Sequence, residues 1–373
     1  METVFWISLV GVLYPYAGYP IALWLLGRLA ADPPPPAGAE LPEISMIVPV
    51  HNEEQRLPKK LANTAALTYP PDRLEIILVS DGSTDRSVEL IRSTMTAGMH
   101  LIELAARGGK AAALNAGLQA AKHDIVVFTD ASIELEANAL QQLVKGFADP
   151  AVGCISGEDR IAEGGGEGTY GKYEILLRRL ESRLHSIVGA SGCFYAQRRA
   201  ICDPFTEGMA PDFLSVLRAV EHGYRARTEP DAVGVMSSVK DPRDEFDRKV
   251  RTLIRGMTTL FAHPRLLNPF RFGMFAFALW SHKVLRWTVP FFLLTAFLSS
   301  LLMLDRTWYA MVFAAQVAFY AGALLALAQW GGWHRSLAGK ITLYFSTANA
   351  AILAAWYRYG RGVRQEVWTP SQR

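Results

Sequence analysis

Three apolar segments, each followed by acidic or amide side chains, constrain this chain more than any other feature. Residues 75–85 read EIILV then SDGSTD, residues 44–54 read ISMIVPV then HNEE, and residues 124–132 read DIVVFT then DAS. Buried parallel strands read as continuous apolar runs, and neighbouring parallel strands end at a common edge of the sheet. The three segments therefore predict an α/β sheet with carboxylates along its carboxyl edge.

This acidic edge indicates a nucleotide site. Ligands of open α/β sheets bind outside the carboxyl ends of the strands. A single strand followed by Asp-Gly, as at Asp81-Gly82, is also an ordinary turn. Three such strands in succession favour a nucleotide-diphosphate site that uses acidic side chains and a metal ion.

Long apolar segments on both sides of this region predict membrane helices, because a helix needs about 20 apolar residues to cross a bilayer. Three segments approach that length: Val4–Leu26, Thr288–Leu304 and Trp308–Trp330. A fourth, Ile341–Trp356, is shorter and carries serine, threonine and asparagine. The alternative, that these are buried core helices, is disfavoured because so many occur in a chain of 373 residues.

Basic residues set the expected topology. The first segment has no basic residue before it and is followed by Arg28, so we interpret it as a retained anchor rather than a signal peptide. Lysines and arginines also precede the second segment, and the positive-inside rule then places the region between the two segments in the cytoplasm. If Ile341–Trp356 crossed the membrane, the arginine-rich tail would lie outside, against this rule. We therefore expect that this segment does not fully cross.

Charge and cysteine content argue against several classes of protein. The formal net charge of +3 is too small to indicate a nucleic-acid partner. The basic residues cluster beside the apolar segments, where anionic lipids account for them. Cys154, Cys193 and Cys202 have no CxxC spacing, so the sequence predicts neither a disulfide framework nor a zinc site.

Taken in order, the motifs resemble those of the family 2 glycosyltransferases with a GT-A fold. The segments that carry the resemblance are VPVHNEE at 48–54, VSDGSTD at 79–85, GGKAAALNAG at 108–117, FTDAS at 128–132, GASGCFYA at 189–196 and PDFL at 211–214. The resemblance covers residues 44–255, and the apolar segments resemble those of the membrane-bound branch, which includes hyaluronan and cellulose synthases. It implies a multi-pass protein of the cell membrane.

The expected fold is α/β, with a GT-A (Rossmann-like) nucleotide-sugar-binding domain and added transmembrane and interfacial helices. We expect an N-terminal transmembrane anchor at 1–28, a proline-rich linker at 29–42, the cytoplasmic GT-A domain at 43–240, amphipathic interfacial helices at 241–286, and C-terminal membrane helices with a basic tail at 287–373. In the fourth part, Phe246, Val250, Leu253 and Met257 share one face of a basic helix. This pattern is typical of a helix that lies in the membrane interface.

The resemblance implies roles for residues near the first two strands and the glycine loop. Pro49, Asn52 and Glu53 would contact the nucleoside, together with Asp81, whose carboxylate can accept hydrogen bonds from a ribose or base. The alternative for Asp81, and for Asp85, is a cap on the following helix. Lys110, after two glycines, would contact the donor phosphates or the transferred sugar. Asn115 would fix the loop.

Asp130 and Ser132 occupy the place of the family's Asp-x-Asp motif, which holds Mg²⁺ or Mn²⁺ against the diphosphate. Mg²⁺ usually takes one or two carboxylates together with substrate phosphates. The second acid is a serine here, so Asp130 would supply the one carboxylate. Ser132 would bind the metal directly or through water, or would cap the next helix.

Asp212 matches the family's general base for the acceptor hydroxyl, at the head of an amphipathic helix. An ordinary aspartate is a weak base near neutral pH, so its site must raise its pKa or polarise the acceptor. The residue before it is Pro211, where the family usually has another acid. The alternative is a helix N-cap. Gly192 lies in a small-residue segment that could let an acceptor approach closely.

Arg251 and Arg255 are the candidates for a contact with the diphosphate on the acceptor side. Processive synthases carry Gln-x-x-Arg-Trp in this region, whereas residues 248–252 read RKVRT and lack the glutamine and the tryptophan. Contact with lipid headgroups accounts for these charges equally well.

The sequence thus predicts inverting transfer of a sugar from a nucleotide-diphosphate sugar, with UDP as the carrier that the resemblance implies. The acceptor would be a polysaccharide or a lipid-linked glycan at the cytoplasmic membrane face. One alternative is a non-processive enzyme that uses a polyprenyl phosphate or a glycerolipid. Another is a membrane subunit that senses a nucleotide without catalysis.

Overall fold

The computed structural model describes residues 1–29, 40–161, 166–236 and 242–364. Most of the predicted proline-rich linker and basic tail lie outside these residues. In the described part, one mixed sheet has the strand order β3-β2-β1-β4-β7-β6-β8-β5. The strands are β1 Ile44–Val50, β2 Leu74–Asp81, β3 Met99–Leu104, β4 Ile125–Thr129, β5 Ile133–Leu135, β6 Val152–Ile161, β7 Phe194–Arg198 and β8 Arg225–Met236.

The three strands that the sequence predicted are β1, β2 and β4, and they lie side by side. β1 pairs in parallel with β2 on one side and with β4 on the other. All residues of β1 and β4 are buried, as continuous apolar runs require. β7 runs antiparallel to β4, so the sheet is mixed rather than wholly parallel.

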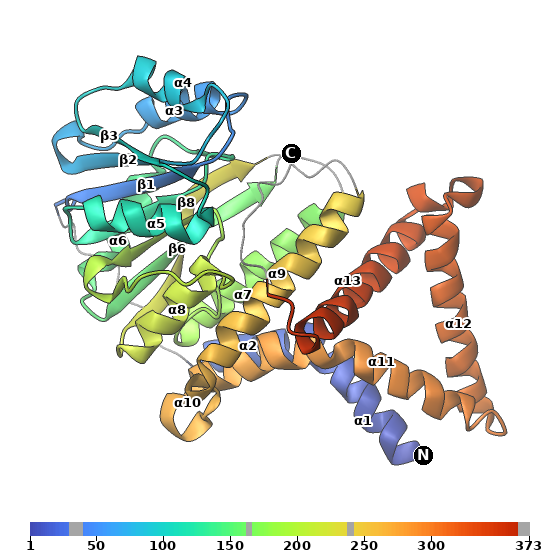
Figure 1. The fold of residues 1–373 in the computed structure, drawn as a ribbon. Coiled ribbons are helices and arrows are strands. Elements are labelled where there is room, and N and C mark those ends of the chain that lie inside the picture. The colour runs from blue at the N-terminus through green and yellow to red at the C-terminus, as the bar shows by residue number, and fades with distance from the viewer. Residues whose placement is uncertain (30–39, 162–165, 237–241, 365–373) are drawn as a thin grey trace.

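Helices cover both faces of the sheet (Figure 1). They are α3 Leu57–Ala65, η2 Pro71–Arg73, α4 Ser87–Thr94, α5 Gly109–Ala120, α6 Ala139–Lys145, η3 Gly146–Ala148, α7 Gly166–Leu184, η4 Arg199–Ile201 and α8 Pro211–Glu221. Alternate residues of β1 enter different cores: Ile47 packs with α5 and α8, and Met46 packs with α3 and α6. This alternation follows from the two-residue period of a strand.

Three helical segments are long and apolar enough to cross a membrane: Glu2–Gly27, Pro269–Leu301 and Thr307–Leu327. The first comprises α1 Glu2–Leu13, η1 Tyr14–Gly18 and α2 Tyr19–Gly27. The second comprises α10 Pro269–Leu279, η6 Trp280–Val284 and α11 Leu285–Leu301, and the third is α12. In Figure 1, α1, α11 and α12 extend away from the sheet domain.

The surface of these segments is apolar. Val10, Leu294, Met311 and Leu324 each expose more than half of their side chain. Large exposed apolar patches of this kind mark contact with a membrane or a partner. The length and composition of the segments favour the membrane.

Helix α9, Pro242–Ala262, forms much of the region 241–286 for which the sequence predicts interfacial helices. Its side chains Val250, Ile254 and Met257 are fully buried in the main core, with Trp287 and residues of α13, Leu337–Gly360. This apolar face thus packs against other helices, as an amphipathic helix can, and the interfacial position of α9 stays a prediction. The exposed position is instead Phe270, in α10, which follows η5 Pro264–Leu267.

Residues 341–356 form part of one helix, α13, which η7 Trp330–Arg335 connects to α12. α13 is not among the three candidate spans. Thr342 and Asn349 are buried, and they donate hydrogen bonds to carbonyl oxygens of their own helix, Ala338 O and Phe345 O. α13 packs on both α12 and α9 (Figure 1). Its failure to cross the membrane stays a prediction.

Candidate active site

The carboxyl ends of β1, β2 and β4 bring Asn52, Asp81 and Asp130 to one edge of the sheet. Asn52 has a positive φ of 51°, in the left-handed region that asparagine tolerates. Its Oδ1 accepts a hydrogen bond of 2.8 Å from the Thr84 amide, which ties the loop after β1 to the loop after β2. Pro49 lies inside β1, paired with Val79, and not in that loop.

Glu53 is buried at the same edge. Its Oε2 accepts a hydrogen bond of 2.8 Å from Arg56 Nη1. Burial raises the pKa of Glu53 and Arg56 opposes that rise, while the negative charge of Asp130 adds to it. The influence of Asp130 places Glu53 in the electrostatic environment of the predicted metal motif.

Asp81 holds the glycine loop. Its two carboxylate oxygens accept hydrogen bonds of 2.7 and 2.8 Å from the amides of Gly108 and Gly109. Asp85 accepts a hydrogen bond from the Ser87 amide, the first residue of α4, while the N-cap position itself is held by Arg86. Each oxygen of Asp81 keeps a lone pair for a further donor, so a nucleoside contact remains compatible with this geometry.

Lys110 connects two parts of the site that are far apart in the sequence. Its Nζ lies 2.5 Å from Asp130 Oδ1 and donates a hydrogen bond of 3.2 Å to the carbonyl oxygen of Gly192. Gly109, with φ +88°, starts α5 and positions this lysine. Asn115, in the same helix, exchanges two hydrogen bonds with the backbone of Phe205, which fits the predicted loop-fixing role.

Ser132 is followed by the strand β5, not by a helix, so the helix-cap alternative for it was wrong. Among the described residues, no group of three or more His, Cys, Asp or Glu side chains could hold a metal. One carboxylate, from Asp130, and one hydroxyl, from Ser132, are nevertheless an oxygen set that suits Mg²⁺ or Mn²⁺ when substrate phosphates supply further ligands.

A buried lysine that the sequence analysis missed supports the turn between β4 and β5, which carries Asp130 and Ser132. Lys60 Nζ donates hydrogen bonds to Thr129 Oγ1 at 3.1 Å and to the carbonyl oxygen of Ile133 at 2.8 Å. These residues flank Asp130 and Ser132 on both sides. Burial lowers the pKa of Lys60 to about 8. The residue before it, Lys59, is also a lysine, and the pattern of α3 gave no signal of this role.

Asp212 is the second residue of α8, and the N-cap position is held by Ala210. The N-cap alternative for Asp212 was therefore wrong. Burial raises the pKa of its carboxyl, while the positive charges of Lys110, Arg255 and Lys283 act in the opposite direction. A Cβ added to Gly192 would lie 4.0 Å from Asp212 Oδ2, so the small-residue segment passes beside this carboxylate.

Of the two arginines predicted on α9, Arg255 is the one near Asp212. Arg255 donates two hydrogen bonds to the Met209 carbonyl oxygen, at 3.0 Å from Nε and 2.6 Å from Nη2. It thereby fixes the segment before α8. The pKa of Arg251 is lowered by burial and by Arg248, and Asp247 opposes this, so its electrostatic neighbours are residues of α9 itself.

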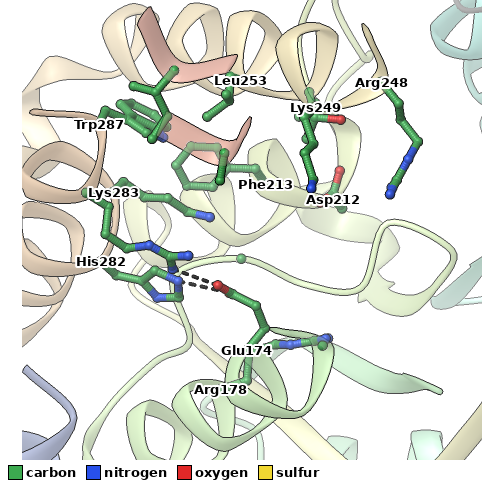
Figure 2. A pocket seen from close by; sticks show the side chains of 18 of the residues that line it. Glu174, Arg178, Asp212, Phe213, Arg248, Lys249, Leu253, His282, Lys283 and Trp287 are labelled. Carbon is green, nitrogen blue, oxygen red and sulfur yellow. Dashed lines mark hydrogen bonds and ion pairs between the residues drawn. The ribbon is translucent and has the colours of Figure 1, made fainter. Parts of the chain in front are cut away.

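A cavity of about 410 Å³ lies beside Asp212, between the sheet domain and the helices that follow it. Its walls come from α7, α8, α9, η6, α11 and α13, with Tyr16 from the N-terminal segment. Figure 2 shows Asp212, Phe213 and Lys249 at one side of this space and Lys283 facing them. Sequence patterns could not reveal the cavity, because its walls meet only through tertiary packing.

A buried polar cluster closes another side of the cavity. His282 lies between two carboxylates, with Nδ1 2.6 Å from Glu181 Oε1 and Nε2 3.1 Å from Glu174 Oε2. Arg286 Nη1 donates to Glu174 Oε1 at 2.6 Å (Figure 2). Tyr19 OH donates to Glu181 Oε1. Through Glu174 and Glu181 of α7, the cluster joins the N-terminal segment to the second membrane segment.

Comparison with known proteins finds a family match over part of the chain. Residues 45–204 match the family described as Glycosyl transferase family 2. The poly-beta-1,6-N-acetyl-D-glucosamine synthase of Staphylococcus aureus (strain COL) is 28% identical over 212 residues, which are 52% of this chain and 50% of that protein. The probable glycosyltransferase YdaM of Bacillus subtilis (strain 168) is 34% identical over 220 residues, with the same coverage of both chains. The matches span about half the length of each relative.

A solved structure extends the likeness to nearly the whole chain. Mannosyltransferase PcManGT from Pyrobaculum calidifontis, in complex with GDP-Man and Mn²⁺, has a TM-score of 0.72 and 25% sequence identity. The match covers 95% of this chain and 98% of that one. The predicted GT-A fold with added membrane helices is therefore confirmed.

Proposed function

Because this chain carries a family 2 glycosyltransferase domain, we propose that it transfers a sugar from a nucleotide-diphosphate sugar to an acceptor hydroxyl, with inversion at the anomeric carbon. The acceptor is a glycan or a lipid-linked group that enters the cavity beside Asp212. The observation that carries this proposal is the bridge made by Lys110, which links Asp130 at the sheet edge to Gly192 beside Asp212.

On this proposal, the nucleoside lies over Asn52, Glu53 and Asp81. The diphosphate lies near Asp130 and Lys110. The positive charge of Lys110 stabilises the leaving group as negative charge develops on it. Asp130 and Ser132 would hold a divalent cation, which neutralises charge on the diphosphate when bound. The likeness to a structure that contains Mn²⁺ supports this cation requirement.

Asp212 takes the proton of the acceptor hydroxyl. Its raised pKa makes it a stronger base than an ordinary aspartate, as general-base catalysis near neutral pH requires. The hydroxyl oxygen bonds to the anomeric carbon as the bond from that carbon to the phosphate oxygen breaks. A single displacement of this kind needs no nucleophilic carboxylate and inverts the configuration.

The nucleotide base is a separate part of the proposal. The resemblance of the motifs implies UDP, whereas the structure similar over nearly the whole chain contains GDP-Man. Both classes of donor must therefore be tested. We also propose that the protein is multi-pass and that the sheet domain faces the cytoplasm, on the distribution of basic residues around the candidate spans.

The test is nucleotide release by the purified full chain with UDP- and GDP-linked sugars, in the presence of membrane extract as acceptor source. Wild type is expected to release nucleotide, and excess chelator and Asp130→Asn are each expected to remove most of this activity. Glu134→Gln, at a partly exposed acid four residues later, is the matched control and is expected to retain it. Full activity in excess chelator would refute the metal requirement, and no release with any donor would favour a non-catalytic sensing subunit.

A further inference from the structure

The cavity beside Asp212 combines charged and apolar walls. Leu253 and Trp287 lie on one side in Figure 2, and Lys283 and Glu174 lie on another. Trp287 belongs to the candidate membrane span Pro269–Leu301, and Ile352 of α13 adds to the apolar wall. A ligand that fills this space would contact charged side chains near Asp212 and apolar side chains near the membrane helices.

Lys283 lines the same cavity as Arg178 and Arg286 but, unlike these two arginines, forms no ion pair with a described residue. Arg178 pairs with Asp159 at 2.9 Å, and Arg286 pairs with Glu174 at 2.6 Å. Across the described ranges of the chain, no carboxylate oxygen lies within ion-pair distance of Lys283 Nζ. The amine instead lies 5.3 Å from the centre of the Phe213 ring, and 3.6 Å from where a Cβ on Gly189 would be.

This position favours an anionic occupant. The side chain is partly buried, and the carboxylates that act on its charge, Glu174, Glu181 and Asp212, lie beyond ion-pair distance, so an anionic ligand would supply a direct counter-ion. Phe213 follows Asp212 directly in α8, and Gly189 belongs to the same small-residue segment as Gly192. An anion bound at Lys283 would therefore lie next to the proposed base and the reacting hydroxyl.

We propose that Lys283 binds the phosphate of a membrane lipid and that a free hydroxyl on the same headgroup is the acceptor. This inference rests on the proposed function and narrows its acceptor to one class. The apolar wall contributed by Leu253, Trp287 and Ile352 suits the lipid's hydrocarbon chains. A neutral glycan would need neither that wall nor an additional cation.

The presence of Asp212 decides which atom of the lipid reacts. A phosphate oxygen is already ionised at neutral pH and would leave a general base without a proton to accept. A headgroup hydroxyl gives its proton to Asp212 as its oxygen bonds to the anomeric carbon, and the nucleoside diphosphate leaves. The lipid phosphate at Lys283 is not broken or formed in this step.

The first experiment measures binding by the detergent-solubilised full chain, with fluorescent phosphatidylglycerol as the probe. Lys283→Met and Lys283→Gln are expected to weaken binding about tenfold, in line with the loss of one charged hydrogen bond. Lys283→Arg keeps the charge and is expected to retain binding. Lys340→Met, which removes an exposed lysine on α13 outside the cavity, is the matched control. Melting temperatures in the same detergent establish that each variant is folded.

Competition separates the possible sources of the phosphate. Phosphatidylmethanol, which has a phosphate but no headgroup hydroxyl, is expected to displace the probe, and diacylglycerol is not. Inorganic phosphate or glycerol phosphate that competed at the same concentration as the lipid would overturn the assignment to a lipid. Equal binding by wild type and by folded Lys283→Met and Lys283→Gln would also overturn it.

Turnover in vesicles completes the test. Labelled sugar is expected to enter phosphatidylglycerol and not phosphatidylmethanol, and Lys283→Met is expected to raise the KM for the lipid more than it lowers kcat. Transfer to diacylglycerol at the same rate as to phosphatidylglycerol would contradict a role for the phosphate. The absence of nucleotide release from every donor would refute the proposed function, while the binding data judge Lys283 separately.

Discussion

Asp212 shows the sharpest conflict between charge and burial at the site. Its carboxyl is desolvated, and three cations, Lys110, Arg255 and Lys283, surround it without ending the rise of its pKa. A surface carboxylate is stable as the ion and accepts a proton poorly. Burial thus destabilises the ionised form of Asp212 at the position where a raised pKa favours general-base catalysis.

We predict that Asp212→Asn lowers turnover by about 10²–10⁴-fold, the usual contribution of general acid–base catalysis, with little change in donor affinity. Steady-state kinetics and a separate donor-binding measurement check this. Loss of donor binding with unchanged turnover of bound substrate would show that Asp212 is a binding residue. In wild type, kcat/KM should fall as the pH drops through the raised pKa, because protonated Asp212 accepts no proton.

The same substitution should affect stability. The folded state raises the pKa of Asp212, so above that pKa the folded chain carries a penalty for the charged carboxylate that the unfolded chain lacks. Asp212→Asn removes the penalty and is expected to raise the melting temperature at pH 7. The gain should shrink as the pH falls through the folded pKa, and an unchanged or lower melting temperature at pH 7 would contradict the assignment.

Lys60 gives a prediction of the opposite sign. Burial lowers its pKa to about 8, so between that pH and the ordinary value of 10.5 the unfolded chain binds more protons than the folded chain. Stability should therefore rise with pH across this window, and Lys60→Met should lack that component. Melting temperatures from pH 7 to 10.5 check this, with the exposed neighbour Lys59→Met as control. Equal pH slopes for wild type and Lys60→Met would refute it.

At the scale of elements, the site depends on helices that reach across the sheet edge. α5 delivers Lys110 and is held by Asp81 at its first turn. α9 fixes the segment before Asp212 through Arg255, and Thr259 Oγ1 accepts a hydrogen bond from the Ala210 amide. The base thus depends on a helix that follows the sheet domain in the chain, which couples the site to the membrane-proximal part.

The contact between α1 and α11 permits a direct test of packing. A Cβ on Gly11 would lie 2.6 Å from a ring atom of Phe292, whereas a Cβ on Gly360 would meet nothing within 4 Å. We predict that Gly11→Ala destabilises the full chain by about 1–3 kcal/mol, as overpacking does. Gly360→Ala, the matched control, should be neutral or stabilising, since alanine is the better helix former.

Thermal unfolding in detergent measures both variants. Phe292→Leu should restore part of the stability lost in Gly11→Ala, because it removes the ring that the new methyl group meets. Equal melting temperatures for wild type and Gly11→Ala would show that α1 can move away from α11 without cost.

At the scale of the whole molecule, the candidate spans define a path through the membrane. Three helical segments qualify as spans, and α13 packs back on α9 and α12 (Figure 1). With the sheet domain in the cytoplasm, α11 leads out and α12 returns. If α13 then stays on the cytoplasmic side, the arginine-rich end remains where the positive-inside rule favours it.

We therefore predict that the carboxyl terminus is cytoplasmic. A single cysteine replacing Gln372, in a chain whose three native cysteines are replaced, should resist a membrane-impermeant thiol reagent in intact cells and react after permeabilisation. A cysteine replacing Asp305, between α11 and α12, should react in intact cells and serves as the control. Labelling of position 372 from outside would show that α13 crosses.

The sequence by itself determined the features that depend on near neighbours in the chain. The runs before Asn52, Asp81 and Asp130 were predicted to be buried strands because their side chains are apolar on both faces. The three long apolar segments were predicted as membrane helices because their composition is also a property of consecutive residues. The sequence could not tell whether α9 faces lipid or protein, because its apolar stripe suits both.

Only the tertiary structure decided which distant residues meet. Arg255, and not Arg251, lies near Asp212, and Lys60 donates a hydrogen bond to Thr129, next to Asp130. Lys283 reaches the cavity from a candidate membrane span. Each of these lysines and arginines has an ordinary sequence context. Their roles arise from desolvation and from partners that other helices supply, and these are set by how the helices pack.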